Sequence, residues 1–225
     1  LSAARPIVTE PAFLERLTPE QRTGPEWIVA VGDAGHGTIA FDALPFEPPR
    51  ALSLGLSADD AIGLIVYTSG TTSRPKGVAH TQRRLSYRVD LFVEEMGHTE
   101  EDATVVASEI GRPVILMGQV LPMFRTGGQL ILIDGGDPAA FWAAYRAQGR
   151  TSYVITPAGA APTLLGHPAA GQVSHGSLRY WICGGDRVLP IGHQRAHEVL
   201  GRPIHEMLGM TEAGFFAITP PGVEI

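Results

Sequence analysis

The residues best suited to chemistry lie between positions 68 and 77, where hydroxyl side chains and glycines accompany one lysine after the apolar run 61–66. Glycines let backbone N–H groups approach an anion closely. Hydroxyl groups donate to phosphate oxygens or ligate hard cations, and a lysine adds a mobile positive charge. The segment therefore predicts a loop that binds a polyphosphate. Its candidate binding residues are Thr68, Ser69, Gly70, Thr71, Thr72, Ser73, Lys76 and Gly77.

Two other interpretations of this segment are weaker. The phosphate loop of nucleotide triphosphatases follows the pattern Gly-x4-Gly-Lys-Ser/Thr. Gly70 could begin that pattern, but Pro75 stands at its second glycine and Gly77 replaces the hydroxyl that would hold magnesium. A plain polar turn is the other alternative, because Ser, Thr and Gly cluster in loops anyway. A turn does not require so many hydroxyls beside a lysine, so a phosphate-binding role is favoured.

Three motifs, at residues 67–78, 184–186 and 208–214, resemble those of the adenylate-forming superfamily in type and in order along the chain. That superfamily includes acyl- and aryl-CoA ligases, peptide-synthetase adenylation domains and luciferases. Residues 67–78 resemble its phosphate-loop signature, with Ser73 in place of the usual glycine. Residues 208–214 resemble its aromatic-Gly-x-Thr-Glu motif, and residues 184–186 resemble its short Gly-Gly loop beside the adenine. The resemblance covers nearly the whole chain, from about position 12 to position 221.

The resemblance implies ATP, Mg²⁺ and coenzyme A as cofactors and assigns roles to individual residues. It places Thr211 at the α-phosphate and Glu212 on magnesium, an ion that prefers one or two protein carboxylates with phosphates and water. Thr71 is a second candidate metal ligand, and Lys76, Thr211 and Glu212 are the candidate catalytic residues. Without the flanking Gly209 and Thr211, Glu212 would be interpreted as a solvated carboxylate at a helix start. The remaining candidate nucleotide-binding residues are Gly184, Gly185, Asp186, Leu208, Gly209 and Met210.

Two departures from the family pattern bear on the substrate. Leu208 stands where the family usually stacks a tyrosine on the adenine. Glu109 falls near the family's aromatic-histidine pair at the acyl pocket, where a buried, unpartnered carboxylate would be costly. Either the pocket takes a cationic or hydroxylated acid, or the alignment shifts by a few residues. The Phe-Asp-x-Ser motif of amino-acid adenylation domains is not found in residues 104–113, which favours plain carboxylic acids.

Other candidate residues are interpreted more simply. His193 and His197 lack the His-Glu-x-x-His order of a zinc site and are predicted to lie on a solvated helix face. His80 either packs near the phosphates, as the resemblance implies, or has a structural role. Candidate acyl-pocket residues beside the motifs are Ile182, Cys183, Met207 and Met210. Plain core is expected for the helix face formed by Val114, Leu116, Met117, Val120 and Leu121.

Composition limits the class of protein. The chain has 225 residues, of which 44% are hydrophobic and 18% are charged, and this is enough to bury a core. The net charge of −6 disfavours a nucleic-acid partner. A lone cysteine, Cys183, excludes an internal disulfide, fits a reducing cytoplasm and is expected to be a small buried hydrophobe. No stretch approaches the ~18 apolar residues of a membrane span.

Hydrophobic periodicity predicts alternating strands and helices. Strands are expected at 27–31, 61–67, 104–107, 128–133, 151–155, 178–183, 203–207 and 215–219. Helices are expected at 11–17, 82–96, 114–125, 138–148, 162–165 and 191–200. The expected fold is α/β, with a predominantly parallel sheet covered by helices. Ligands bind at the carboxyl ends of such strands, and all three motifs directly follow predicted strands, so one shared site is expected.

The resemblance further implies that residues 1–225 are a partial N-terminal core domain. Family members carry an upstream segment, and their mobile C-terminal domain bears the catalytic lysine. The expected reaction of the parent enzyme is ATP-dependent activation of a small carboxylic acid as acyl-adenylate, then thioesterification to coenzyme A. An acyl ligase that loads a carrier protein and a non-catalytic nucleotide-binding scaffold are the alternatives. The isolated piece is expected to be inactive, and its oligomeric state is open.

Overall fold

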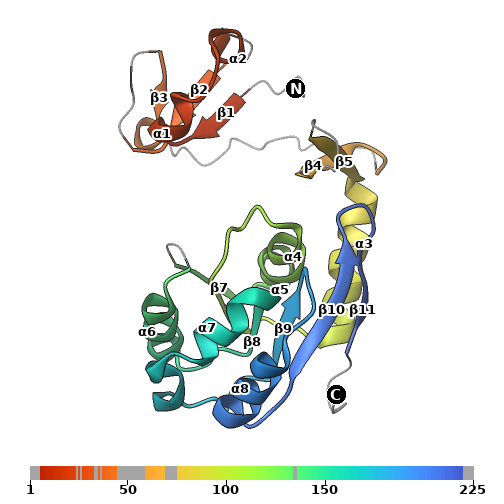
Figure 1. The fold of residues 1–225 in the computed structure, drawn as a ribbon. Coiled ribbons are helices and arrows are strands. Elements are labelled where there is room, and N and C mark those ends of the chain that lie inside the picture. The colour runs from red at the N-terminus through yellow and green to blue at the C-terminus, as the bar shows by residue number, and fades with distance from the viewer. Residues whose placement is uncertain are drawn as a thin grey trace. The chain divides into compact units, whose positions relative to one another are not determined.

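The computed structural model describes residues 6–23, 25, 27–32, 35, 37–44, 59–68, 75–133 and 136–219. The chain divides into two compact units, residues 1–55 and residues 56–225 (Figure 1). All three motifs lie in the second unit.

The first unit is built on a three-stranded parallel sheet in the order β1-β2-β3. Two short helices connect β1 to β2, and each begins at a proline, a residue whose fixed φ suits the first helical position. The helix expected at 11–17 is shorter than predicted, and a small core forms from Leu14, Ile28 and Ala30. The elements are β1 Pro6–Thr9, α1 Pro11–Leu14, α2 Pro19–Thr23, β2 Trp27–Ala30 and β3 Ile39–Ala40.

The second unit contains a six-stranded sheet in the order β11-β10-β9-β8-β6-β7. Every neighbouring pair is parallel except β10 and β11, which form an antiparallel pair at one edge. The prediction of an α/β fold with a predominantly parallel sheet is therefore confirmed. The strands are β6 Ala103–Val106, β7 Gln129–Leu132, β8 Tyr153–Pro157, β9 Tyr180–Gly184, β10 Ile204–Met210 and β11 Gly214–Ile218.

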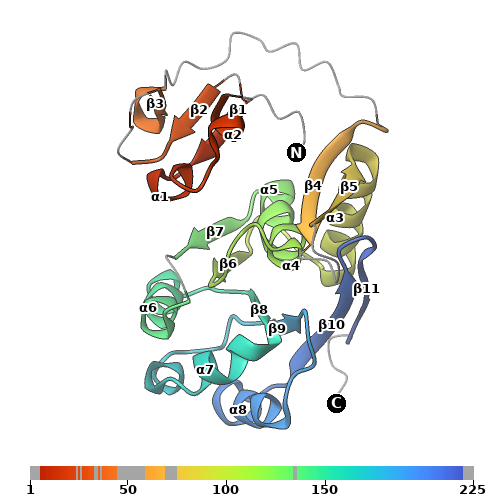
Figure 2. The same ribbon diagram turned by 45° about the horizontal axis from the view of Figure 1, so that its top comes forward.

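Helices cover both faces of this sheet (Figure 2). One face packs against α6 Pro138–Gln148, α7 Ala161–Leu165 and α8 Pro190–Leu200. The other packs against α3 Gln82–Met96, α4 Pro113–Ile115 and α5 Leu121–Thr126. Side chains alternate along the strands, as a pleated backbone requires. On β9, Trp181 and Cys183 face the first helix group, while Tyr180 and Ile182 face the second.

Local signals fix the helix ends close to their predicted places. Thr81 caps α3 by accepting a 3.3 Å hydrogen bond from the Arg84 backbone N–H, and Gly97 ends the helix in the left-handed conformation. Asp137 caps α6 through the Ala139 N–H. The helix expected at 114–125 is α4 and α5 joined by a π-helical turn at Leu116–Val120.

The first motif lies in a hairpin outside the large sheet. Strand β4, Ile62–Thr68, pairs antiparallel with β5, Lys76–Thr81, and both strands pack beside α3. A strand leads into the loop, as predicted, but it does not belong to the predicted parallel sheet. Parallel strands need a crossover of a dozen or more residues, and only residues 69–75 separate β4 from β5. The polar residues before Val78 concealed the second strand.

Candidate functional site

The hairpin holds the two ends of the predicted phosphate loop together. Thr68 pairs directly with Lys76 across the two strands, which brings a hydroxyl and an ammonium to the base of the loop. Thr68 is half-buried, whereas Lys76 and Gly77 are exposed. The other predicted loop residues lie outside the described part of the chain; they are Ser69, Gly70, Thr71, Thr72 and Ser73.

The second and third motifs meet in one cavity of about 310 Å³, here called the turn cavity because it borders the turn at residues 211–213. Parallel pairing of β9 with β10 sets Gly184 opposite Met207, so the carboxyl ends of both strands open onto the same space. Two of the three motifs therefore line one cavity, and that this cavity is the ligand site stays a prediction. The lining residues are Arg112, Pro113, Val114, Met117, Gly184, Gly185, Met207, Gly209, Met210, Thr211, Gly214 and Phe215.

Two glycines in these motifs are required by the backbone. A Cβ on Gly209 would lie 2.6 Å from the Gly214 carbonyl oxygen, so only glycine allows β10 and β11 to approach this closely where their register shifts. Gly185 has a φ of +86°, a conformation that side chains with a Cβ rarely adopt. The motif sequence therefore shapes the walls of the turn cavity directly.

A second cavity of about 620 Å³, here called the loop cavity, lies beside the first. It shares Gly185, Met207 and Gly209 with the turn cavity and adds two predicted nucleotide-binding residues, Asp186 and Leu208. The Leu208 side chain is 60% exposed, so its aliphatic face is free to cover a ligand. The other lining residues are Arg187, Glu206, Ala217, Ile218 and Thr219.

Glu206 on β10 is a lining residue that sequence reasoning missed. Its carboxylate contacts the His193 imidazole, with Nε2 and Oε1 2.9 Å apart, and accepts a longer bond of 3.4 Å from the Val188 N–H. The prediction that His193 lies on a solvated helix face is therefore wrong, because His193 is half-buried against Glu206. Helical spacing alone gave no sign of a partner on β10, whereas His197 is exposed as expected.

His80 on β5 connects the hairpin to the Thr-Glu turn. The side chain is 1% exposed, and its imidazole lies beside the backbone of Thr211. Burial lowers the pKa of His80 and the nearby Arg88 charge lowers it further, while the Thr211 backbone favours the protonated ring. Arg88 on α3 in turn lies against Gly214, where any Cβ would collide with its guanidinium. The base of the hairpin is thereby held near the turn that carries Glu212.

Four predicted residues do not line either cavity: Thr68, Lys76, Gly77 and Glu212. Glu212 is exposed on the turn between β10 and β11, so the alternative of a helix-start carboxylate does not apply. Within the described ranges, no group of three or more His, Cys, Asp or Glu side chains could hold a metal ion. A single carboxylate still fits Mg²⁺ when the ion arrives with phosphates and water.

The structure also resolves two expectations about single residues. Glu109 is not buried: its side chain is 82% exposed, with Oε2 3.4 Å from Arg112 Nε. The costly buried carboxylate considered for the acyl pocket therefore does not exist. Cys183 is fully buried, as expected, and burial raises the pKa of its thiol to about 12. A thiol with that pKa is a core residue and not a nucleophile.

The family profile and the related sequences point to the same family. The profile of the family described as AMP-binding enzyme matches residues 9–224. A feruloyl-CoA synthase from Amycolatopsis sp. is 32% identical over 175 residues, which cover 77% of this chain and 34% of the relative. The oxalate–CoA ligase of Arabidopsis thaliana is 30% identical over 152 residues, covering 67% and 30%. The chain thus spans about a third of the length of these curated relatives.

Solved structures share the fold. The amide bond synthetase McbA from Marinactinospora thermotolerans superposes with a TM-score of 0.75 at 26% identity, over 96% of this chain and 43% of that one. Apo MatB from Rhodopseudomonas palustris gives a TM-score of 0.79 over 100% of this chain and 44% of that one, and at 19% identity it supports the fold alone.

None of the helices in the described ranges has the length and apolarity needed to cross a bilayer. The arrangement of the motifs around two adjoining cavities, the family profile and the two CoA-ligase relatives agree. This chain belongs to the AMP-binding enzyme family.

Proposed function

We propose that the whole protein uses ATP to activate a small carboxylic acid and then transfers the acyl group to coenzyme A. A carboxylate oxygen attacks the α-phosphorus, the bond to pyrophosphate breaks, and an acyl-adenylate forms. The coenzyme A sulfur then attacks the acyl carbon, and AMP leaves. Residues 1–225 would form part of the large N-terminal domain. The coenzyme A step rests on the relatives that are CoA ligases.

One observation carries the nucleotide-binding part of this proposal. The glycine loop at 184–186 and the strand end at 209–211 open onto the same turn cavity, and His80 links that strand end to the phosphate hairpin. Leu208 and Asp186 would border the adenine in the loop cavity, and Thr211 would bind the α-phosphate. Thr68, Lys76 and the loop between them would hold the β- and γ-phosphates by charge-assisted hydrogen bonds.

The described residues fit a magnesium ion only together with the nucleotide. Glu212 is the exposed carboxylate nearest in sequence to Thr211, and Thr71 remains the second proposed ligand. When bound, Mg²⁺ would neutralise charge that develops on the departing pyrophosphate. Glu212 would hold the ion beside the α-phosphate, and the neighbouring Thr211 hydroxyl would orient a phosphate oxygen.

Titration calorimetry with ATP, with and without Mg²⁺, tests this proposal. We expect Mg²⁺ to tighten ATP binding by wild type, and Glu212→Ala to abolish that gain because the ion loses its protein carboxylate. Glu198→Ala is the matched control, since Glu198 is also exposed but lies on α8 in an ion pair with Arg195. Identical curves for wild type and Glu212→Ala would instead support a non-catalytic nucleotide-binding scaffold.

An amine or a carrier-protein thiol as acceptor would use the same activation step. The fold shared with an amide bond synthetase and the 29% identity to surfactin synthase subunit 2 over 140 residues keep these acceptors as the alternative. An assay in which coenzyme A competes with another acceptor for the acyl group, done on the full-length protein, distinguishes these acceptors. With acid and ATP supplied, our proposal expects coenzyme A to be consumed in preference to free amines.

A further inference from the structure

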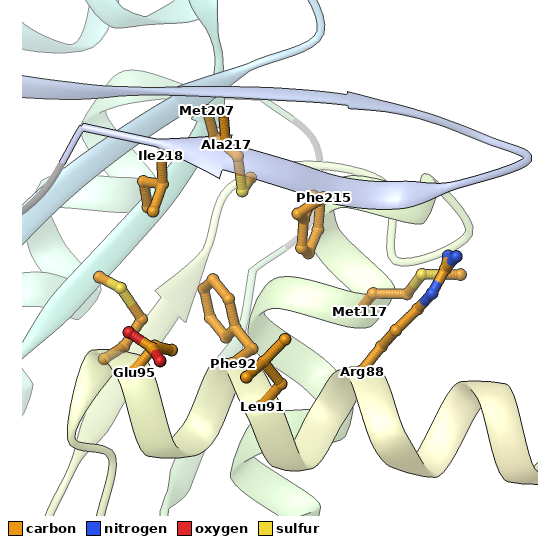
Figure 3. Close-up of a pocket in the computed structure, with 10 residues that line it drawn as sticks. Arg88, Leu91, Phe92, Glu95, Met117, Met207, Phe215, Ala217 and Ile218 are labelled. Atoms are coloured by element: carbon orange, nitrogen blue, oxygen red, sulfur yellow. The ribbon is translucent and has the colours of Figure 1, made fainter.

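A third cavity, here called the helix cavity, lies between α3 and β11 (Figure 3). Its volume is about 240 Å³, and its walls are mainly apolar. The only charged side chains among its lining residues are Arg88 and Glu95, which come from α3 and lie at opposite ends of the cavity in Figure 3. The apolar lining consists of Leu91, Phe92, Met96, Met117, Met207, Phe215, Ala217 and Ile218.

The helix cavity adjoins the turn cavity. Met117, Met207 and Phe215 line both, so a ligand in one touches the walls of the other. Arg88 marks the end nearest the Thr-Glu turn, because its guanidinium lies against Gly214, which itself lines the turn cavity. The apolar space therefore leads toward the place where the proposed function puts the α-phosphate.

Arg88 carries a positive charge that no carboxylate in the described structure pairs with. Its Nη1 is buried and has no hydrogen-bond partner in the described structure, and Arg88 joins no ion pair there. Burial lowers the pKa of Arg88, and the nearby Arg84 charge lowers it further, so its surroundings disfavour the charge. A buried N–H without a partner costs free energy, and an anionic ligand would remove that cost.

We propose that the helix cavity binds the hydrocarbon part of a small apolar monocarboxylic acid and that Arg88 binds its carboxylate. This inference rests on the proposed function and names the substrate class of that site. Glu95 at the opposite end repels a carboxylate, so the acid enters in one orientation, with its reacting group toward Gly214 and Thr211. A guanidinium grips a carboxylate through two parallel hydrogen bonds, which also fixes its direction.

The size of the cavity limits the acid. At about 30 Å³ for each water-sized group, a volume of about 240 Å³ holds roughly eight such groups. A single aromatic ring with a carboxylate fits this volume. A second carboxylate is disfavoured, because the far end carries Glu95 and apolar walls. Benzoate is therefore a suitable probe.

Binding of benzoate to the 225-residue chain can be followed by NMR titration without nucleotide. We expect shifts in α3 and β11, at Leu91 and Ile218 in particular. Arg88→Gln should weaken benzoate binding by about 10- to 100-fold, which is the loss of one charge-assisted contact, and Arg88→Lys should restore part of it. Benzamide, the uncharged counterpart, should bind wild type and Arg88→Gln equally. Arg83→Gln is the matched control, since Arg83 lies on the same helix in an exposed ion pair with Asp60.

A second variant tests the cavity without touching the charge. Leu91→Trp fills the space from α3 and should block benzoate while Arg88 remains, because Leu91 lines the helix cavity and neither of the other two. Mg²⁺-ATP binding should be unchanged in Leu91→Trp. A wild-type chain that binds benzoate but not Mg²⁺-ATP would defeat the proposed function and leave this inference standing. Equal benzoate affinity in wild type and Arg88→Gln, a parallel loss of benzoate and benzamide, or no shift in α3 and β11 of the folded chain would overturn it.

Discussion

The two faces of the six-stranded sheet have the same architecture and differ in the cavities that border them. The face under α6–α8 is packed with large aromatic side chains whose polar atoms are paired. Trp142 Nε1 donates to the Leu164 carbonyl at 2.8 Å, and Trp181 Nε1 donates to Thr156 Oγ1 at 3.0 Å. The face under α3–α5 borders the helix and turn cavities, and Arg88 Nη1 is buried there without a partner in the described structure. Buried atoms without partners are not confined to that face, because Arg202 Nε on the α6–α8 side is another.

This difference bears on stability and function within one sheet. Dense packing and satisfied hydrogen bonds stabilise a fold, whereas apolar cavities with a few polar groups are typical of ligand sites. We infer that both faces stabilise the fold and that the α3–α5 face also carries ligand binding. Substitutions on the two faces should therefore fail in different assays.

The largest expected effect is on the packed face. Trp181 is fully buried in the aromatic cluster, so Trp181→Ala should lower the free energy of unfolding by about 3–5 kcal/mol. Urea denaturation measures this loss. Leu91→Ala on the other face is the comparison, because Leu91 is 42% exposed and lines the helix cavity. A Leu91→Ala loss as large as that of Trp181→Ala would remove the distinction between the faces.

The next effect concerns ligand binding. A methyl group on Gly209 would meet the Gly214 carbonyl, so Gly209→Ala should push β11 away and distort the turn cavity. We expect Mg²⁺-ATP affinity to fall at least about tenfold, which is ~1.4 kcal/mol, as measured by calorimetry. Gly171→Ala meets no atoms within 4 Å and serves as the control. If Gly209→Ala bound Mg²⁺-ATP as wild type does, the turn cavity would not be the nucleotide site.

A pH effect should arise from His98 on the α3–α5 face. Burial lowers the pKa of His98 to about 4, although the adjacent Asp102 carboxylate opposes that shift. In the unfolded chain His98 therefore binds a proton near pH 6.5, whereas in the folded chain it binds one only near pH 4. Stability should be unaffected by His98 above that pH and fall by up to about 1.4 kcal/mol per pH unit between pH 6.5 and 4. His98→Gln should have a lower but flatter urea-midpoint profile, and an equally steep one would exclude His98 as the cause.

The smallest effect is expected at the surface of the packed face. Arg195 and Glu198 form an exposed 2.8 Å ion pair on α8, away from the aromatic cluster. Exposed pairs contribute little, so Arg195→Gln should change the free energy of unfolding by less than about 0.5 kcal/mol and leave ligand binding intact. A larger change in the free energy of unfolding or in ligand affinity, in the same urea and calorimetric assays, would mean that surface contacts on this face matter as well as its core.

The sequence predicted well what depends on local patterns. Amphipathic spacing and the glycine at 97 located α3, and the Gly-Gly and Thr-Glu motifs identified residues that meet in the turn cavity. The sequence did not predict features that depend on contacts between separate elements. Strand β5 was hidden because its pairing with β4 has no signal beyond a short apolar run. The partner of His193 lies on β10, thirteen residues away, and helical spacing could not indicate it.

Arg88 illustrates both the reach and the limit of sequence reasoning. The spacing of Arg88, Leu91, Phe92 and Glu95 follows one stripe of α3, which is a pattern that sequence alone could have revealed. That the stripe faces a cavity depends on β11 lying opposite, with Phe215 between the two cavities. Only the folded chain brings those elements together.

The most direct test uses Lys76, the only lysine in the chain. Lys76 is modified with an amine-selective reagent, and the rate of its modification is measured without ligand and at a subsaturating concentration of Mg²⁺-ATP. If the hairpin and the turn carrying Glu212 close on one nucleotide, Mg²⁺-ATP protects Lys76 in wild type, and Glu212→Ala loses that protection while Glu198→Ala retains it. Protection that is absent in wild type, or equal in Glu212→Ala, would contradict the account.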